Sequence, residues 1–253
     1  MKILLGIGSI VLFAYIGASV LLYIFQRDLL YFPTEKYEHP FDRFSISSQG
    51  ETIELIVLNK GNSKALLYFG GNGEAVVANA EAFLSIFSDL TIYLVNYRGY
   101  GGSSGKPTES GICADSLTIY DEIIEHHTQL SVAGRSLGSG VATYLAAERT
   151  IESIVLITPY DSILNVVKTR LPVFPVKLLL KDHYDSLSRV KNIQSKVLVI
   201  AAEHDQVIPM KHTQRLIDEF GSGQTRLKII RNSGHNSLSI NDDYLLSLKE
   251  FVQ

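Results

Sequence analysis

The sequence predicts an α/β fold: a mostly parallel central sheet with helices on both faces, preceded by an N-terminal transmembrane helix. After residue 44, short runs rich in apolar and β-branched residues alternate with longer amphipathic runs, which is typical of a doubly wound sheet. Most of the later short runs are almost continuously apolar, as expected of parallel strands that are covered on both faces. A long uncharged segment at the N-terminus predicts the transmembrane helix.

The uncharged segment, Ile3 to Phe25, has 23 residues. As a helix it would be about 34 Å long, enough to cross a hydrocarbon core of about 30 Å. We therefore predict a membrane anchor over 1–27 and a single domain over 28–253. The main alternative is a cleaved signal peptide, but the apolar region of such a peptide usually has roughly 7 to 15 residues, and no small-x-small cleavage site precedes the polar sequence here. A buried helix of a soluble protein is a weaker alternative, because the segment has no polar face.

Charge and cysteine content narrow the possible partners. The chain has 23 basic and 26 acidic residues and a formal net charge of −3, so it offers no electrostatic footprint for nucleic acid and no polybasic tail for anionic lipid. Basic residues flank both ends of the apolar segment, Lys2 on one side and Arg27 and Lys36 on the other, which leaves open the side of the membrane on which the domain lies. The single cysteine, Cys113, excludes an internal disulfide and a cysteine-built zinc site, and we expect it to be a buried apolar side chain.

The expected elements follow one another regularly along the rest of the chain. Strands are predicted over residues 52–59, 64–69, 90–97, 130–134, 153–158, 196–202 and 226–231. Helices are predicted over residues 74–88, 115–127, 139–149, 210–220 and 243–252. The segment 159–192, with Pro159, Pro172 and Pro175, has the weakest pattern, and we expect it to form a small cap insertion over the carboxyl edge of the sheet.

Two serines lie in the pattern G-x-S-x-G, which is typical of a nucleophile elbow. Ser136 lies in VAGRSLGSG and Ser103 in GYGGSSGKP. An elbow needs a strand that runs into it and a helix that leaves it, so that the helix N-terminus faces the developing negative charge. Ser136 has both, whereas Lys106 and Pro107 follow Ser103 in a stretch with the composition of a surface loop. We predict Ser136 as the nucleophile and a structural role for Ser103.

A serine hydroxyl needs a histidine to accept its proton and an acid to orient that histidine. In proteins with a nucleophile elbow, the acid and the histidine follow the serine in the chain, in that order, and each comes from the end of a later strand. His235, in RNSGHNS, follows the last predicted strand, and Asp205, in AAEHDQVIP, follows the strand before it. Asp161, at the end of an earlier strand, is the alternative acid. His212 lies inside a predicted helix, and we expect it on the solvated side.

Acyl transfer also needs backbone N–H groups that stabilise the oxyanion. One donor is expected from Leu137, the residue after the nucleophile, and the other from the loop YFGGNGEA. In that loop we predict Asn72 as the donor, with Gly71 beside it. The alternative is an ordinary glycine-rich turn.

Several segments together resemble a known family. They are FQRDLLYFP, YFGGNGE, NYRGYGGSSGKPTE, AGRSLGSGVA, TPYDSI, AEHDQVIP and the late SGH. In this order they resemble membrane-anchored serine hydrolases of the α/β-hydrolase fold, including the α/β-hydrolase domain-containing proteins with an N-terminal single-pass anchor. The resemblance covers nearly the whole chain and implies Ser136 as nucleophile, Asp205 as orienting acid and His235 as base. The chain departs from the family at Gly70-Gly71, where His-Gly is usual; the departure concerns how the oxyanion loop is braced, and not its backbone donors.

We therefore expect a membrane-tethered serine hydrolase that cleaves carboxylic esters or thioesters through an acyl-enzyme, on lipid or acylated substrates near a membrane. The alternatives are a non-catalytic, membrane-tethered interaction module and a serine peptidase of the same fold. The presence of all three triad residues in order disfavours the module. No G-x-G-x-x-G follows the early strands and no H-E-x-x-H is present, so neither a dinucleotide nor a metal cofactor is expected.

Overall fold

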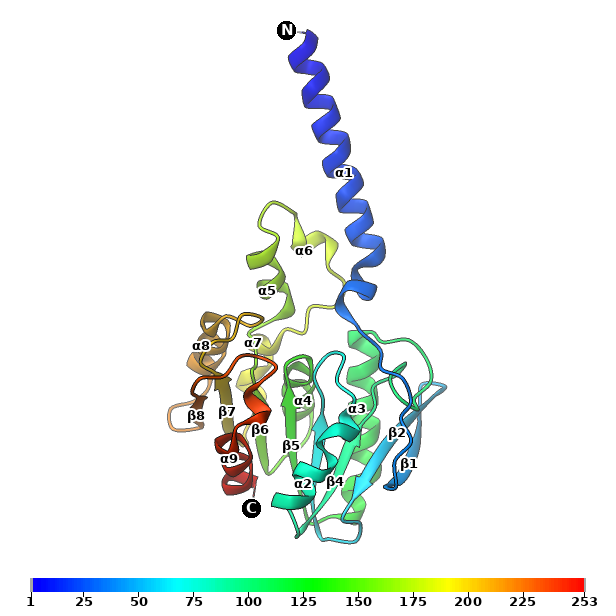
Figure 1. The fold of residues 1–253 in the computed structure, drawn as a ribbon, viewed down its shortest axis with the longest axis vertical. Coiled ribbons are helices and arrows are strands. Elements are labelled where there is room, and N and C mark those ends of the chain that lie inside the picture. The colour runs from blue at the N-terminus through cyan, green and yellow to red at the C-terminus, as the bar shows by residue number, and fades with distance from the viewer. Residues whose placement is uncertain (1, 253) are drawn as a thin grey trace.

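The computed structural model describes residues 2–252, with side chains from residue 6 onward, and its main feature is one eight-stranded sheet (Figure 1). The strand order is β1-β2-β4-β3-β5-β6-β7-β8. Strand β2 is antiparallel to both of its neighbours, and all other neighbouring pairs are parallel. The prediction of a mostly parallel sheet is thereby confirmed.

The seven predicted strands are all present, within two residues at their ends. They are β2 (Glu51–Leu58), β3 (Lys64–Phe69), β4 (Leu90–Val95), β5 (Gln129–Arg135), β6 (Ser153–Ile157), β7 (Lys196–Ala202) and β8 (Thr225–Ile230). The sequence reading missed β1 (Asp42–Ser48). This edge strand, DRFSISS, is largely polar and exposed, so its period is weak; it is held by pairing with β2.

Helices cover both faces of the sheet, with side chains alternating between two cores. Leu67 of β3 packs in the core beneath one set of helices, while its neighbours Leu66 and Tyr68 pack in the other. The first core includes side chains from α3 (Glu109–Ile123), α4 (Leu137–Glu148) and α8 (Met210–Glu219). The second includes side chains from α2 (Ala80–Ile86) and α9 (Asp242–Val252).

Two helices differ from their predicted bounds for local reasons. The run predicted as a helix over 74–88 is a short 3-10 helix, η1 (Val76–Asn79), followed by α2. Helix α3 begins at Glu109, ahead of the predicted start at 115, because the Thr108 side chain accepts a hydrogen bond from the Gly111 N–H at 3.0 Å and caps the helix. Cys113 lies in α3 and is buried, and burial raises the pKa of its thiol to about 12.

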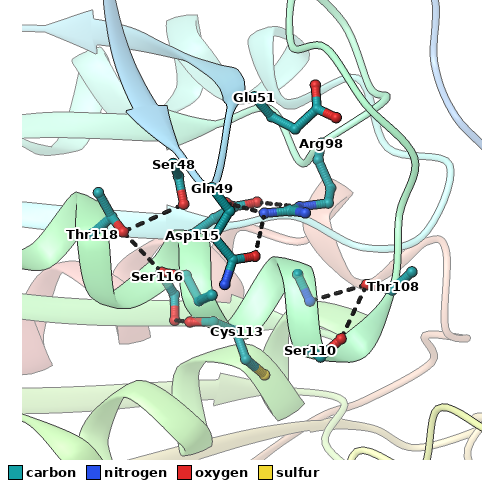
Figure 2. A network of polar contacts seen from close by, with 12 residues as sticks. Ser48, Gln49, Glu51, Arg98, Thr108, Ser110, Cys113, Asp115, Ser116 and Thr118 are labelled. Carbon is teal, nitrogen blue, oxygen red and sulfur yellow. Dashed lines mark hydrogen bonds and ion pairs between the residues drawn. The ribbon is translucent and has the colours of Figure 1, made fainter.

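A buried ion pair fixes α3 to the glycine-rich segment that follows β4. Figure 2 shows Arg98 of this segment reaching Asp115 of α3. Arg98 Nε donates to Asp115 Oδ2 at 2.7 Å, and the two residues are only 8% and 3% exposed. A side chain at Gly111 would meet the Arg98 guanidinium and would have to displace it from its present position.

Asp115→Asn is expected to destabilise the protein by about 3 to 5 kcal/mol, because it leaves the Arg98 charge buried without a counterion. The control is Asp121→Asn, which breaks the more exposed pair that Asp121 forms with Arg149; such pairs contribute only about 0 to 1 kcal/mol. Urea unfolding of both variants measures the difference. Equal losses would contradict the electrostatic explanation.

The N-terminal helix α1 (Lys2–Leu30) projects away from the sheet, and its N-terminal part extends beyond the rest of the chain (Figure 1). Within the described residues, it is the one helix long and apolar enough to cross a membrane: Gly6–Leu30 has a mean hydropathy of 2.2, and the most apolar stretch is not buried. The molecule thus carries a long lipophilic helix that its own core does not cover.

The segment between β6 and β7 also lies outside the sheet. It contains α5 (Ile163–Arg170), α6 (Val176–Leu179), α7 (Ser186–Arg189) and the 3-10 helix η3 (Val190–Asn192). Helices α5 and α6 stand above the sheet edge on the side from which α1 projects (Figure 1). We refer to residues 159–192 as the α5–α7 segment.

Candidate active site

The candidate site lies where the direction of chain winding reverses. From the central strand β3 the chain goes to β4 on one side and then to β5 on the other. In doubly wound sheets, ligands bind outside the carboxyl ends of the strands at such a point. Ser136 follows β5 there, and the loop that contains Gly71 and Asn72 follows β3.

The backbone at Ser136 forms a tight strand-to-helix turn. Its φ of 48° and ψ of −113° are uncommon for a residue with a side chain, and the Ser136 N–H is held by the Ile157 carbonyl at 2.8 Å. A side chain at Gly134 would collide with the Gly138 carbonyl, and one at Gly138 would collide with the Phe69 carbonyl. Backbone atoms cannot move aside, so the two glycines of G-x-S-x-G are required for the close packing of β5, α4 and β3.

Three side chains from separate strand ends form a continuous hydrogen-bonded chain. His235 Nε2 lies 2.9 Å from Ser136 Oγ, and His235 Nδ1 lies 2.7 Å from Asp205 Oδ2. The other Asp205 oxygen accepts the N–H groups of Val207 and Ile208 at 2.8 and 2.7 Å. The Asp205 carboxylate is therefore oriented by its own loop, and the structure brings together the three residues that the sequence singled out.

The alternative acid, Asp161, has a different partner. It is fully buried, and its Oδ1 lies 2.9 Å from Nδ1 of His212. Asn165 and Arg215 also donate to the Asp161 carboxylate. The expectation that His212 lies on the solvated side of its helix is wrong, because this residue is only 5% exposed and joins α8 to the start of α5 through Asp161. The sequence of α8 gave no sign that His212 faces a buried acid, because Asp161 is 51 residues away in the chain.

The two predicted oxyanion donors line the same cavity as Ser136 and His235, whose volume is about 460 Å³. Within residues 2–252, the backbone N–H groups of Leu137 and Asn72 donate to no protein acceptor. The N–H of Gly71, in contrast, donates to Glu74 at 2.8 Å. The arrangement leaves the two predicted N–H groups available to a bound oxygen.

A partly buried ion pair braces the loop after β3, and sequence reasoning missed it. Glu74 Oε2 accepts both the Gly71 N–H and, at 3.1 Å, Arg135 Nη1, while Arg135 Nη2 donates to the His235 carbonyl at 3.2 Å. Burial acts to lower the pKa of the Arg135 guanidinium, but the charge of Glu74 and nearby tyrosines outweigh it, and the pKa is raised. This charged pair therefore joins the loop, the elbow and the histidine loop. The sequence signal for this pair was weak: Glu74 directly follows the glycine-rich loop, and Arg135 directly precedes Ser136.

Ser103 has the structural position expected of it. Its hydroxyl donates to the Asn96 carbonyl at 2.8 Å and accepts the Glu54 N–H at 2.8 Å. It therefore links the segment after β4 to β2.

For the described part of the chain, no group of three or more His, Cys, Asp or Glu side chains is placed to hold a metal ion.

No protein-family model matches the chain. It is 26% identical to protein bem46 of Schizosaccharomyces pombe, over 91% of this chain and 87% of that protein. It is 27% identical to alpha/beta hydrolase domain-containing protein 17B of Homo sapiens, over 81% of this chain and 73% of that protein.

Among solved structures, the chain is similar to the Pyrococcus furiosus esterase Pf2001, with a TM-score of 0.71 and 15% identity over 87% of this chain and 97% of that one. At this identity the likeness shows the fold. The chain is an α/β-hydrolase-fold protein related to bem46 and to alpha/beta hydrolase domain-containing protein 17B.

Proposed function

We propose that the protein is a serine hydrolase that cleaves carboxylic esters or thioesters through an acyl-enzyme on Ser136. The observation that carries the proposal is the hydrogen-bonded chain from Asp205 through His235 to Ser136, at 2.7 and 2.9 Å. These distances lie within the reach required for proton transfer between a nucleophile and its base.

In the proposed reaction, Ser136 Oγ attacks the acyl carbon while His235 Nε2 accepts the hydroxyl proton. The tetrahedral intermediate then collapses, the bond to the leaving oxygen or sulfur breaks, and His235 returns the proton to the leaving group. Water next attacks the acyl-enzyme and gives a proton to His235. The bond between the acyl carbon and Ser136 Oγ then breaks, His235 returns the proton to Ser136 Oγ, and the free acid is released. Asp205 keeps the proton on Nδ1, so that Nε2 is free to accept.

The oxyanion forms next to the two free backbone donors. We assign it to the N–H groups of Leu137 and Asn72, and each such donor lowers the barrier by about 2.7 to 4 kcal/mol. Leu137 is the first residue of helix α4, so the helix dipole adds to the stabilisation of negative charge there. The Glu74–Arg135 pair holds the loop in place before substrate arrives.

We further propose that α1 is a retained membrane anchor and that the α5–α7 segment is a cap over the site, so that the substrates are lipids or acylated molecules at a bilayer. Contacts of the second half of α1 support its retention. Arg27 Nε donates to Asp182 at 2.9 Å and Gln26 Nε2 to the Leu179 carbonyl at 3.0 Å. Cleavage of α1 as a signal peptide would remove these contacts and expose the surface under them.

A fluorophosphonate probe tests the proposal directly, because it forms a covalent bond only with an activated serine. The full chain in vesicles is expected to be labelled at Ser136, and Ser136→Ala to lose the label. Ser103→Ala is the matched control, because it removes the serine of the other G-x-S-x-G pattern and should leave labelling unchanged. Absence of labelling in the folded wild-type chain would contradict the proposal and favour a non-catalytic interaction module.

A further inference from the structure

A second cavity lies between α1 and the α5–α7 segment. It has a volume of about 170 Å³, and all but one of the side chains around it are apolar. We call it the passage. Its walls come from the end of α1, from α5, and from α6 with the residues beside it; they include Leu22, Leu30, Val167, Leu171, Phe174 and Leu179.

The passage adjoins the candidate active site. Leu29, Leu30 and Val167 line both the passage and the cavity that contains Ser136 and His235. At its other end, Leu171 and Phe174 also line a third cavity of about 340 Å³ around the tip of the α5–α7 segment. The passage is therefore adjacent to both other cavities and lies between the tip and the cavity that contains Ser136.

The polar groups around the passage are already paired. The one polar lining residue, Gln26, donates from Nε2 to the Leu179 carbonyl and accepts the Lys181 N–H at Oε1, at 3.0 and 2.6 Å. Its amide therefore closes the gap between α1 and α6 and leaves no group that demands a polar ligand. The remaining surface of the passage favours an apolar occupant.

Helix α1 is also fastened to the oxyanion loop. Asn72 Nδ2 donates to the Leu30 carbonyl at 2.6 Å, and Asn72 Oδ1 accepts the Phe32 N–H at 2.9 Å. The side chain of Asn72 thus fixes the end of the helix, and Asn72 also lines the active-site cavity. The wall of the passage and the catalytic loop are held in one arrangement.

The tip of the α5–α7 segment lies beside the apolar part of α1 (Figure 1). Tyr15 donates from its hydroxyl to the Val173 carbonyl at 2.9 Å, and its ring stacks on Phe174 at 5.4 Å. At 1.5 Å per residue, Tyr15 is about 18 Å further along the helix axis than Arg27. If α1 spans the bilayer, the tip therefore lies within it, which explains why Val173 and Leu178 are 71% and 81% exposed.

We propose that the passage binds the acyl chain of a bilayer-resident lipid ester or thioester and guides it from the membrane to Ser136. The inference rests on the proposed hydrolase function and adds the source and path of its substrate. If a long acyl chain had to cross water, the equilibrium constant for its transfer out of the bilayer would fall by about fourfold for every methylene exposed. Between α1 and the cap it stays in apolar surroundings until its carbonyl reaches the nucleophile.

Filling the passage should select against long chains. In phosphatidylcholine vesicles, Leu22→Trp and Leu179→Trp are each expected to lower kcat/KM for 4-nitrophenyl hexadecanoate by tenfold or more, and to change kcat/KM for 4-nitrophenyl butanoate by less than twofold. The matched control is Leu21→Trp, next to Leu22 on α1 but at an exposed position that lines none of the three cavities. This control should behave as wild type with both esters.

The outcomes separate the two proposals. If butanoate is hydrolysed through Ser136 and the passage variants lose neither ester, or lose both equally, the passage is wrong and the hydrolase function stands. If neither ester is hydrolysed and Ser136 is not labelled by fluorophosphonate, the hydrolase function is wrong.

A photoreactive diazirine derivative of hexadecanoic acid then tests the passage without turnover, in the Ser136→Ala chain. Crosslinks to Val167 or Leu171 that disappear in the Leu179→Trp background support the passage. Crosslinks confined to exposed side chains of α1 would overturn it.

Discussion

Ser136→Ala and His235→Ala are each expected to lower kcat for ester hydrolysis by about 10⁶-fold. The hydroxyl and the imidazole act as one unit, so the loss of either removes the activated nucleophile; in serine proteases such losses reach this size and are not additive. The 2.9 Å separation of the two groups is the structural basis of the expectation. The double variant should therefore be no slower than either single variant, measured as kcat at saturating ester in vesicles.

His212→Ala is the matched control for the histidine. His212 is buried and hydrogen-bonded to an aspartate, as His235 is, but its partner is Asp161 and neither residue lines the cavity of Ser136. It should lower stability and leave kcat of the folded fraction within a few fold. A loss in His212→Ala as large as that in His235→Ala, or losses that multiply in the double variant, would contradict the assignment.

Asp205→Asn is expected to lower kcat by about 10⁴-fold with little change in the fold. An amide at this position can donate to Nδ1 and so favour the tautomer that carries its proton on Nε2, which then cannot accept the Ser136 proton. The two backbone N–H groups that hold the Asp205 carboxylate can also hold an amide oxygen. The geometry should therefore survive while the chemistry fails, which a circular dichroism spectrum and kcat together measure.

Asp161→Asn makes the same chemical change in the competing pair. Because Asp161 bonds to His212 and to groups at the start of α5, we expect this variant to lower stability and to retain most of kcat. Near-full activity in Asp205→Asn with a large loss in Asp161→Asn would transfer the orienting role to Asp161. The two variants thus decide between the two acids that the sequence left open.

Much of the fold was visible in local patterns. Strands such as β6 and β7 are buried on both faces, so they appear as continuous apolar runs whatever their partners are. The edge strand β1 was missed because most of its side chains are exposed and its stability comes from pairing with β2. The capped start of α3 at Thr108 was missed because one side chain, rather than a hydrophobic period, sets it.

The site divides in the same way. Ser136 was identified because its turn needs glycines at fixed spacing, and His235 and Asp205 because each follows a strand. The brace between Glu74 and Arg135 joins residues 61 positions apart. Neither residue has a local feature that names the other, so the pair could be found only by its distance in space.

The sequence by itself determined the alternation of elements, the apolar N-terminal helix and the three residues at the strand ends, because backbone geometry and burial impose short-range periods and spacings. Only the tertiary structure decided which acid faces which histidine, what braces the oxyanion loop, and that α1 lies against α5 and α6 beside the site. These depend on contacts between segments far apart in the chain, and such contacts are selected by packing and charge pairing in three dimensions.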